Sequence, residues 1–288
     1  AGEGSRLAQE GVKSPKPLIE LQGIPIIERL VMLFMSQGAS SISIIINEQQ
    51  PATLAKLQEL QKRYPIEIVV KDTPSSMHSL HALSHLLRGG KFCLTTVDTI
   101  FKEQEFTDYI KAFEASTHDG MMAVTDFIDD EKPLYVETDS HLDITAFADS
   151  PTAEARYISG GIYGLDDKAL DILDQCMASG IERMRNFQRS LVAGGLKLKA
   201  YPFSKIIDID HAEDIAKAEE FIAGELAQEG IGTVVLVVGG LTFEMIVIGL
   251  NSLVGTHMGL HIDARKEGGG ANEKRREKCK KFVHWLIN

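Results

Sequence analysis

Two periodicities alternate along the chain between residues 24 and 126: short runs of apolar, often β-branched residues, and longer segments with apolar residues at helical spacing. The runs predict strands at 41–46, 66–70, 91–97 and 120–126. The longer segments predict helices at 24–37, 52–63, 78–87 and 103–115. Strands connected by helices in this way lie in a sheet that is covered on both faces. The alternation therefore predicts an α/β fold with a doubly wound, mostly parallel sheet.

The second part of the chain modifies this pattern. Short alternating strands between residues 133 and 163 predict an antiparallel excursion, after which the alternation resumes. The resumed pattern consists of helices at 166–177, 184–193 and 212–223 and a strand at 197–201. The 288 residues suffice for one large α/β domain and a smaller appendage. We therefore expect one domain over residues 1–228 and a separate extension over residues 229–288.

The extension has an unusual composition. Residues 231–255 contain a single charged side chain, Glu244, and residues 272–287 form a basic segment that predicts an amphipathic helix. The apolar run cannot stay exposed in a monomer, so we expect burial in the sheet, against a second copy of the chain or in a membrane. Glu244, Asn251 and many glycines argue against a membrane span, and burial in protein is favoured.

Charge and cysteine content restrict the function further. The chain has 30 basic and 41 acidic residues and a formal net charge of −11, which excludes a protein that holds nucleic acid over its whole surface. A phosphate ligand would be held locally, by backbone amides, a few basic side chains and a metal ion. Cys93, Cys176 and Cys279 match no disulfide framework or zinc spacing, and no signal-peptide pattern opens the chain. A reducing, cytoplasmic location is therefore expected.

A glycine-rich segment near the start of the chain is suited to phosphate. It reads Ala1-Gly2-Glu3-Gly4-Ser5-Arg6-Leu7, and Pro15-Lys16-Pro17-Leu18 follows it. Glycines let backbone N–H groups approach a triphosphate closely. Arg6 can bind the β- and γ-phosphates in a bidentate manner, and Lys16 can neutralise charge that develops on the α-phosphate.

These two segments, together with Gly23-Ile24-Pro25-Ile26-Ile27-Glu28-Arg29, resemble the signature of the sugar-nucleotide pyrophosphorylase (nucleotidyltransferase) family. The resemblance extends over about residues 1–225. It implies a glycosyltransferase-A-like fold and a reaction that joins an NTP to a sugar 1-phosphate or a related phosphate, with release of pyrophosphate. It also implies nucleotide contacts from the glycine-rich loop and from a nucleobase loop at 72–80. The implied contact residues are Ala1, Gly2, Gly4, Ser5, Ser75, Ser76 and Ser79.

The resemblance further implies a metal site at two aspartates. Asp98 ends a predicted strand, in a segment where Val97 stands at the family's usual glycine. Residues 207–215 are similar to the family's closing Asp-Ile-Asp motif, in which Asp208 is the better match and Asp210 the reserve. Asp98 and an aspartate of that motif would hold Mg²⁺, a hard cation that prefers carboxylate and phosphate oxygens.

An acceptor site and a mechanism follow from the same resemblance. Gly160 and Gly161 match the family's glycine pair near the acceptor phosphate, which Lys205 could also reach. The acceptor phosphate oxygen would attack the α-phosphorus in line, and no protein nucleophile is needed. Mg²⁺, Arg6 and Lys16 would supply alignment and charge neutralisation.

Some of these residues have structural explanations as well. Asp98 could end its strand as a cap, and we expect Asp210 to cap the helix that follows it. Lys205 could be a solvated strand lysine. A basic cluster could bind an anionic acceptor, although a solvated helix face explains it better; it comprises Arg183, Arg185 and Arg189. A histidine row lacks the carboxylates or cysteines of a metal site; it comprises His78, His81 and His85.

Two other functions fit the same fold. One is a glycosyltransferase that uses a finished nucleotide sugar, and the other is a non-catalytic nucleotide-sensing module. The pairing of Arg6 with Lys16 argues against the first, because a nucleotide sugar has no β- and γ-phosphates to be held in this way. The presence of both carboxylate positions argues against the second.

One departure from the family concerns the sheet. The family begins with an apolar strand just before the glycine-rich loop, whereas this sequence begins within the loop. Without that strand, the neighbouring strands would leave backbone groups unpaired. Either a preceding strand is missing, or another segment takes its place. The apolar run at 233–238 is the candidate, and we expect it to pair with the main sheet.

Overall fold

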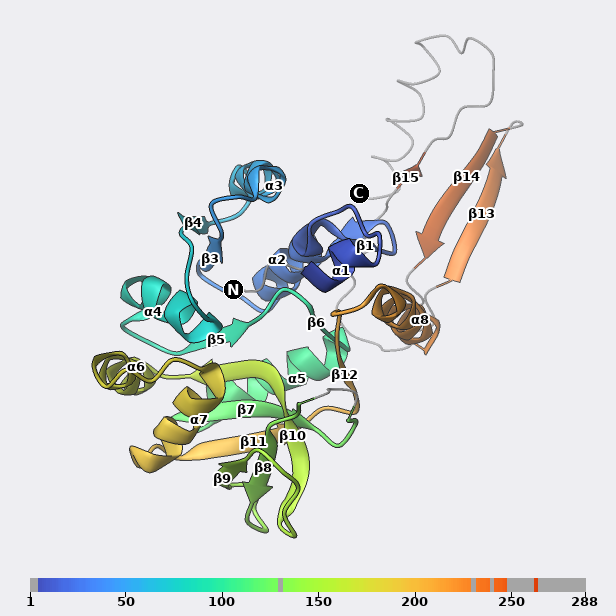
Figure 1. Ribbon diagram of the computed structural model, residues 1–288. Coiled ribbons are helices and arrows are strands. Elements are labelled where there is room, and N and C mark those ends of the chain that lie inside the picture. Colours follow the sequence, from blue (N-terminus) through green and yellow to red (C-terminus); the bar gives the residue numbers. More distant parts are fainter. Residues whose placement is uncertain (1–4, 129–131, 229–231, 239–240, 248–261, 264–288) are drawn as a thin grey trace. The chain divides into compact units, whose positions relative to one another are not determined.

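A computed structural model describes residues 5–128, 132–228, 232–238, 241–247 and 262–263 (Figure 1). The chain divides into two compact units, residues 1–223 and 224–288. The helices are α1 (Ser5–Gln9), α2 (Ile26–Ser36), α3 (Pro51–Gln61), α4 (Ser76–Leu87), α5 (Glu103–Ala115), α6 (Lys168–Ala178), α7 (Met184–Ala193) and α8 (Ala212–Gln228), with a 3₁₀ turn at Lys16–Leu18. The strands of the first unit are β1 (Glu20–Leu21), β2 (Ile24–Pro25), β3 (Ile42–Ile46), β4 (Ile66–Val70), β5 (Phe92–Thr95), β6 (Thr99–Phe101), β7 (Gly120–Thr125), β8 (Tyr135–Thr138), β9 (Ile144–Ala148), β10 (Ala155–Leu165), β11 (Leu198–Pro202) and β12 (Ile206–Asp208).

The largest sheet has the order β11-β7-β10-β8-β9, with β5 also paired to β10. β7 and β11 are parallel, whereas β10 runs antiparallel to β5, β7 and β8. The predicted α/β fold is confirmed, and the predicted antiparallel excursion is β8, β9 and β10.

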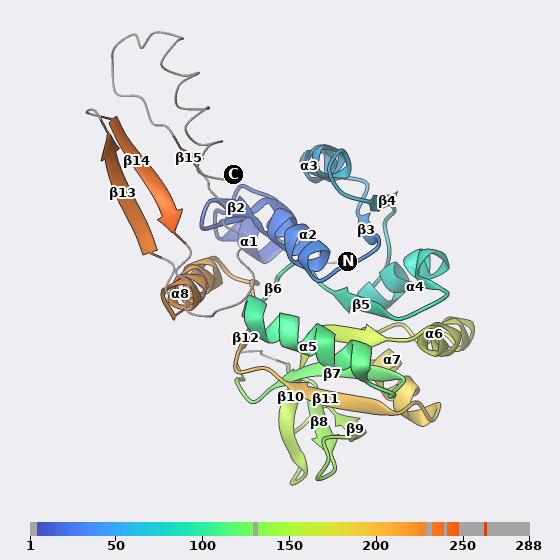
Figure 2. The same cartoon turned by 180° about the vertical axis from the view of Figure 1, so that it is seen from behind.

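Helices cover both faces of this sheet (Figures 1 and 2). β7 shows why, because successive side chains of a strand point to opposite faces. Met121 and Ala123 pack in one cluster with residues of α5, and Met122 and Val124 pack in another with residues of α6 and α7. All residues of β7 are buried, as expected for a strand that is covered on both faces.

The sheet is interrupted between β3 and β5. Among the described residues, β3 pairs with β4 alone and β5 pairs with β10 alone. A cavity of about 1740 Å³ is lined by β3 and β5 together with residues of α2, α4 and α5.

The second unit contains its own antiparallel sheet. β13 (Gly232–Val238) pairs with β14 (Leu241–Val247), which pairs with β15 (Ile262–Asp263). The expectation that residues 233–238 pair with the main sheet is therefore wrong. Two apolar runs separated by Gly-Gly favour local hairpin pairing, which costs less loop-closure entropy than pairing at long range.

Two further predictions concern the extension. The helix predicted at 272–287 lies outside the described residues. In the described part of the chain, no helix is both long enough and apolar enough to cross a membrane.

Candidate active site

Three segments that are far apart in sequence meet at Lys16. Its Nζ lies 2.8 Å from Asp98 Oδ2 and 2.9 Å from Asp210 Oδ1. Lys16 begins the 3₁₀ turn, Asp98 lies in the turn between β5 and β6, and Asp210 lies between β12 and α8. Burial lowers the pKa of Lys16, but the charges and hydrogen bonds of Asp98 and Asp210 outweigh this effect and raise it above its ordinary value. The ammonium group is thus held in its charged form between two carboxylates.

The pairing of β6 with β12 brings the two aspartates together. The strands are antiparallel, with Asp208 opposite Thr99. Beyond the pair, Ile209 N donates to Asp98 O at 3.1 Å. The backbone contact therefore extends to Asp98, and the side chains of Asp98 and Asp210 at this end of the strand pair both contact Lys16.

Arg6 belongs to the same group of charges. Its Nη1 lies 3.7 Å from Asp210 Oδ2, with both side chains about half exposed. Arg6 and Lys16, at the two ends of one loop, therefore both reach Asp210. Ala1, Gly2 and Gly4 lie outside the described residues, and Ser5 begins α1.

Asp210 does not cap α8, contrary to expectation. Asp214 Oδ2 instead accepts from Asp210 N at 3.2 Å and from His211 N at 2.8 Å. Glu10 Oε2 accepts from Ala212 N at 2.6 Å. With the helix start served by these two carboxylates, the Asp210 side chain turns to Lys16 and Arg6. Of the two aspartates in the motif, the reserve candidate is thus the one paired with Lys16.

Asp208 occupies a neighbouring position. Its side chain is exposed, and it ends β12 opposite Thr99. Burial raises the pKa of Tyr163 to about 12, and the charge of Asp208 contributes to the same rise. Asp208 therefore lies near Tyr163, whereas the two carboxylates that contact Lys16 are those of Asp98 and Asp210.

The predicted nucleobase loop lines the same cavity as Lys16. Ser75, Ser76 and Ser79 are all lining residues, as are Arg6 and Asp98. Within the loop, Thr73 Oγ1 and Ser79 Oγ are 2.6 Å apart. Ser75 Oγ contacts His78 Nδ1 at 2.9 Å and donates to Glu182 O. The cavity thus has a charged end and a hydroxyl-rich wall.

The predicted acceptor residues lie in and around β10. Gly160 is closely packed, because a Cβ there would lie 2.2 Å from Ile206 Cδ1 and 3.2 Å from Ala123 O. Gly161 has a φ of +75°, a conformation that favours glycine. Lys205 Nζ lies 4.4 Å from the ring centroid of Phe127 and 5.5 Å from that of Phe221, so the side chain makes cation–π contacts.

A buried polar group next to the glycine pair was missed in the sequence. Gln188 is 3% exposed. Its Oε1 accepts from Ser159 Oγ at 3.0 Å, and its Nε2 donates to Tyr163 Oη at 3.4 Å. A glutamine among the apolar residues that α7 buries was a signal that could have been noticed. Glu10 carried no such signal, because its partners follow some two hundred residues later.

The basic and histidine clusters have structural partners. Arg185 Nη1 and Arg189 Nη2 lie 2.8 and 2.7 Å from Asp149 Oδ1, so they connect α7 to the end of β9. Arg183 stands at the start of α7. His81 Nε2 lies 3.4 Å from Asp174 Oδ1. Among the residues that the structure describes, no group of three or more His, Cys, Asp or Glu could hold a metal ion.

A divalent cation would therefore need oxygens from a substrate as well as from the protein. Asp98 and Asp210 each place an oxygen within 2.9 Å of one cation, the Lys16 ammonium group. Mg²⁺ is commonly bound by one or two carboxylates together with substrate phosphates. The donor set fits such an ion if Lys16 moves to a phosphate.

Comparisons with known proteins identify the family of the chain. Residues 1–225 match a family model described as nucleotidyl transferase. A choline-phosphate cytidylyltransferase from Streptococcus pneumoniae is 22% identical over 240 residues, which cover 78% of this chain and 96% of the relative. A 2-aminoethylphosphonate cytidylyltransferase from Lancefieldella rimae is 26% identical over 108 residues, which cover 36% of this chain and only 42% of that relative.

A solved structure shares the fold. The inositol-1-phosphate CTP transferase from T. maritima superposes with a TM-score of 0.66 at 17% sequence identity. The superposition covers 78% of this chain and 93% of that one.

Proposed function

Because this chain belongs to the nucleotidyl transferase family and is an NTP-dependent nucleotidyltransferase, we propose that it transfers a cytidylyl group from CTP to a small phosphorylated acceptor. A sugar 1-phosphate or a related phosphorylated alcohol is the proposed acceptor, and pyrophosphate is the second product. The observation that carries the proposal is the meeting of Lys16, Asp98 and Asp210 at a cavity that Arg6 also lines.

The proposed roles follow from charge. Arg6 binds the β- and γ-phosphates, where its planar guanidinium can make two parallel hydrogen bonds. Lys16 leaves the carboxylates for the α-phosphate and stabilises charge there in the transition state. Asp98 and Asp210 would hold Mg²⁺, which would supply positive charge that offsets phosphate charge. Asp208 is the alternative second ligand.

The reaction exchanges one phosphorus–oxygen bond for another. An oxygen of the acceptor phosphate attacks the α-phosphorus of CTP, and the bond from that phosphorus to the bridging oxygen of the β-phosphate breaks. Pyrophosphate departs with the electron pair. The protein lowers the barrier by holding the two phosphates in line and by neutralising their charge.

Donor selection is assigned to the loop before α4. Thr73 and Ser75 of this loop and Ser79 in the first turn of α4 all line the cavity, and their hydroxyl groups can donate to or accept from the edge of a cytosine ring. The named donor of the inositol-1-phosphate relative is CTP, and both curated relatives are cytidylyltransferases.

Acceptor selection is assigned to the region of the glycine pair. Buried Gln188 holds the hydroxyl groups of Ser159 and Tyr163 next to Gly160 and Gly161. Such hydroxyl groups suit a polyol, whereas the positive charge of Lys205, which lies over the Phe127 ring, would repel a cationic acceptor. The proposal therefore favours a phosphorylated polyol over a phosphorylated amino alcohol.

A substrate matrix tests the proposal. The protein is incubated with Mg²⁺, one of CTP, UTP, dTTP, ATP or GTP, and one of glucose 1-phosphate, inositol 1-phosphate, phosphocholine or 2-aminoethylphosphonate. Pyrophosphate release that is highest with CTP and a polyol phosphate supports it, with Asp98→Asn as the inactive control. Preference for another NTP or for an amino alcohol refutes the corresponding assignment. Turnover of a nucleotide sugar without release of pyrophosphate would favour the glycosyltransferase alternative. Binding of a nucleotide without any turnover would favour the sensing module.

A further inference from the structure

We propose that Glu10 is a positioning residue, which ties the phosphate-binding loop to the chain segment that follows Asp210. The loop, defined here as residues 6–16, carries Arg6 at one end and Lys16 at the other. This inference rests on the proposed function, because it concerns how these two cations are held for the triphosphate.

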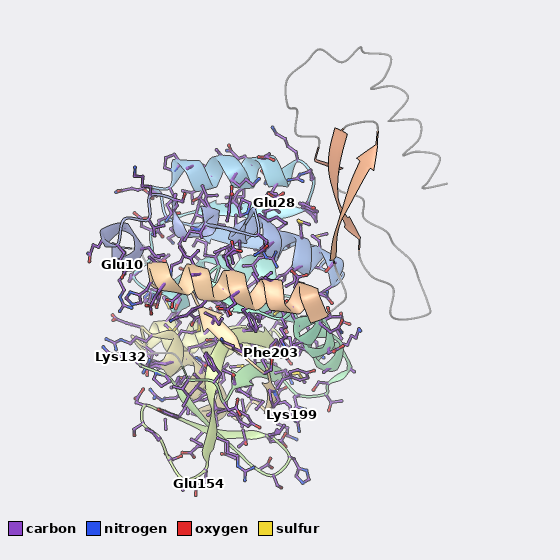
Figure 3. All side chains as sticks on the ribbon, turned by 90° about the vertical axis from the view of Figure 1, so that its right-hand side faces the viewer. Glu10, Glu28, Lys132, Glu154, Lys199 and Phe203 are labelled. Carbon is purple, nitrogen blue, oxygen red and sulfur yellow. The ribbon has the colours of Figure 1, made fainter. Side chains whose placement is uncertain are left out.

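The contacts of Glu10 use both carboxylate oxygens. Oε1 lies 2.6 Å from His211 Nδ1, and Oε2 accepts from Ala212 N at 2.6 Å. Figure 3 shows Glu10 beside α1 and the beginning of α8. His211 and Ala212 directly follow Asp210, so a side chain that fixes them also fixes Asp210.

The loop is shaped so that Glu10 can make these contacts. Glu10 N donates to Arg6 O at 3.0 Å, which extends α1 by one hydrogen bond. Gly11 then has a φ of +89°, and Val12 N donates a hydrogen bond to Leu7 O at 2.9 Å. Leu7 is 2% exposed and anchors the turn in the core.

Glu10 differs from the two loop cations in what happens when a nucleotide binds. Arg6 and Lys16 contact Asp210 in the structure, but in the proposed function both turn to phosphates. Glu10 is anionic and would be repelled by a triphosphate, and its oxygens already serve His211 and Ala212. Glu10 can therefore keep the loop and Asp210 in the same relative position while Arg6 and Lys16 bind the nucleotide.

The substitutions Glu10→Ala and Glu10→Gln separate positioning from charge. Alanine removes both contacts, whereas glutamine keeps an oxygen for Ala212 N and an amide N–H for His211 Nδ1. With saturating acceptor and Mg²⁺, Glu10→Ala should raise KM for CTP about tenfold and leave KM for the acceptor within about twofold. Glu10→Gln should restore KM for CTP to within about twofold of the wild-type value.

A carboxylate elsewhere on α8 provides the structural control. Glu219 Oε1 accepts from Gln22 N at 2.9 Å and so ties the β1–β2 turn to the same helix. Glu219→Ala should lower Tm to a similar extent without raising KM for CTP. An equal rise in KM for Glu219→Ala, or a Glu10→Gln variant as impaired as Glu10→Ala, would overturn the positioning role.

Hydrogen exchange makes the test independent of the assigned substrates. In the ligand-free protein, Glu10→Ala should accelerate exchange of amides in residues 6–12 and 211–214, and Glu219→Ala should not. Unchanged exchange in Glu10→Ala refutes the tie itself. If exchange is faster in Glu10→Ala but the wild-type protein transfers no cytidylyl group, the proposed function is refuted and the structural role of Glu10 is supported.

Discussion

At the residue scale, Lys16 balances the negative charge of two carboxylates, as a bound metal ion would. Its side chain is 16% exposed, and its ammonium group balances the charges of Asp98 and Asp210. Removing it leaves two neighbouring carboxylates without that counter-ion, so they should attract another cation. Lys16→Met should therefore bind Mn²⁺ more tightly than the wild-type protein without nucleotide, in a titration followed by electron paramagnetic resonance. Its kcat should be lower by at least about 100-fold. Equal Mn²⁺ affinity in the two proteins would contradict this role of Lys16.

The two aspartates of the closing motif can be ranked in the same way. Asp210→Asn should lower kcat by at least about 100-fold, as Asp98→Asn should, because each removes a charge from the proposed metal site. Asp208→Asn should lower kcat by less than about tenfold, since Asp208 lies outside the Lys16 ion pairs. Near-wild-type melting temperatures would show that all three variants are folded. A larger loss of kcat in Asp208→Asn than in Asp210→Asn would indicate that Asp208 is the second metal ligand.

At the scale of elements, local pattern predicts what local interactions decide. The bounds predicted for β4, α5 and α7 coincide with those in the structure, because each has a clear period and clear ends. β5 stops at Thr95, before the predicted end at residue 97, because its pairing with β10 ends there. Sequence periodicity alone does not predict the charge cluster of Lys16, Asp98 and Asp210. The resemblance supplied its members, but only the folded chain shows which aspartate faces Lys16, because β6 and β12 are distant in sequence.

The interrupted sheet gives a prediction at the same scale. β3 and β5 present strand edges to the cavity, and Ile44 and Leu94 line it. An apolar, β-branched strand fused ahead of residue 1 should occupy this position. Burial of one Ile-sized side chain, worth about 2 kcal/mol, corresponds to a rise in Tm of about 4–8 °C. A matched fusion with Lys and Pro at the same positions is the control. Equal Tm values, measured by calorimetry, would show that the cavity does not accept a strand.

At the scale of the whole molecule, the two units have separate sheets. β13, β14 and β15 pair among themselves, and the described strands of the first unit pair with each other. A chain that ends at Gln228 should therefore fold and keep its transferase activity. Circular dichroism should show a cooperative transition, and pyrophosphate release should stay within about twofold of that of the full chain, as expected for changes in an independent unit. Aggregated protein would show that the first unit depends on the second.

Acid stability is a second property of the whole molecule. Hydrogen bonds from Lys168 and from the backbone of Lys197 hold the pKa of Asp119 below its usual range. A lowered folded pKa stabilises the protein above the unfolded value of about 3.8, and this stabilisation is lost as pH falls through the folded value. The free energy of unfolding should therefore decrease below about pH 4. For the Asp119→Asn variant, this free energy should decrease less steeply with falling pH than it does for the wild-type protein. Parallel pH profiles from urea titrations would contradict the assignment.

The central claim is that an acceptor oxygen attacks the α-phosphorus of CTP at the centre formed by Lys16, Asp98 and Asp210. The most direct measurement follows an acceptor whose phosphate oxygens carry ¹⁸O, with ³¹P magnetic resonance detection of every product. The account predicts that the bridging oxygen of the new diphosphate carries ¹⁸O, that pyrophosphate carries none, and that Asp210→Asn gives neither product at a comparable rate. Label in pyrophosphate, or CMP formed by attack of water without acceptor transfer, would contradict it.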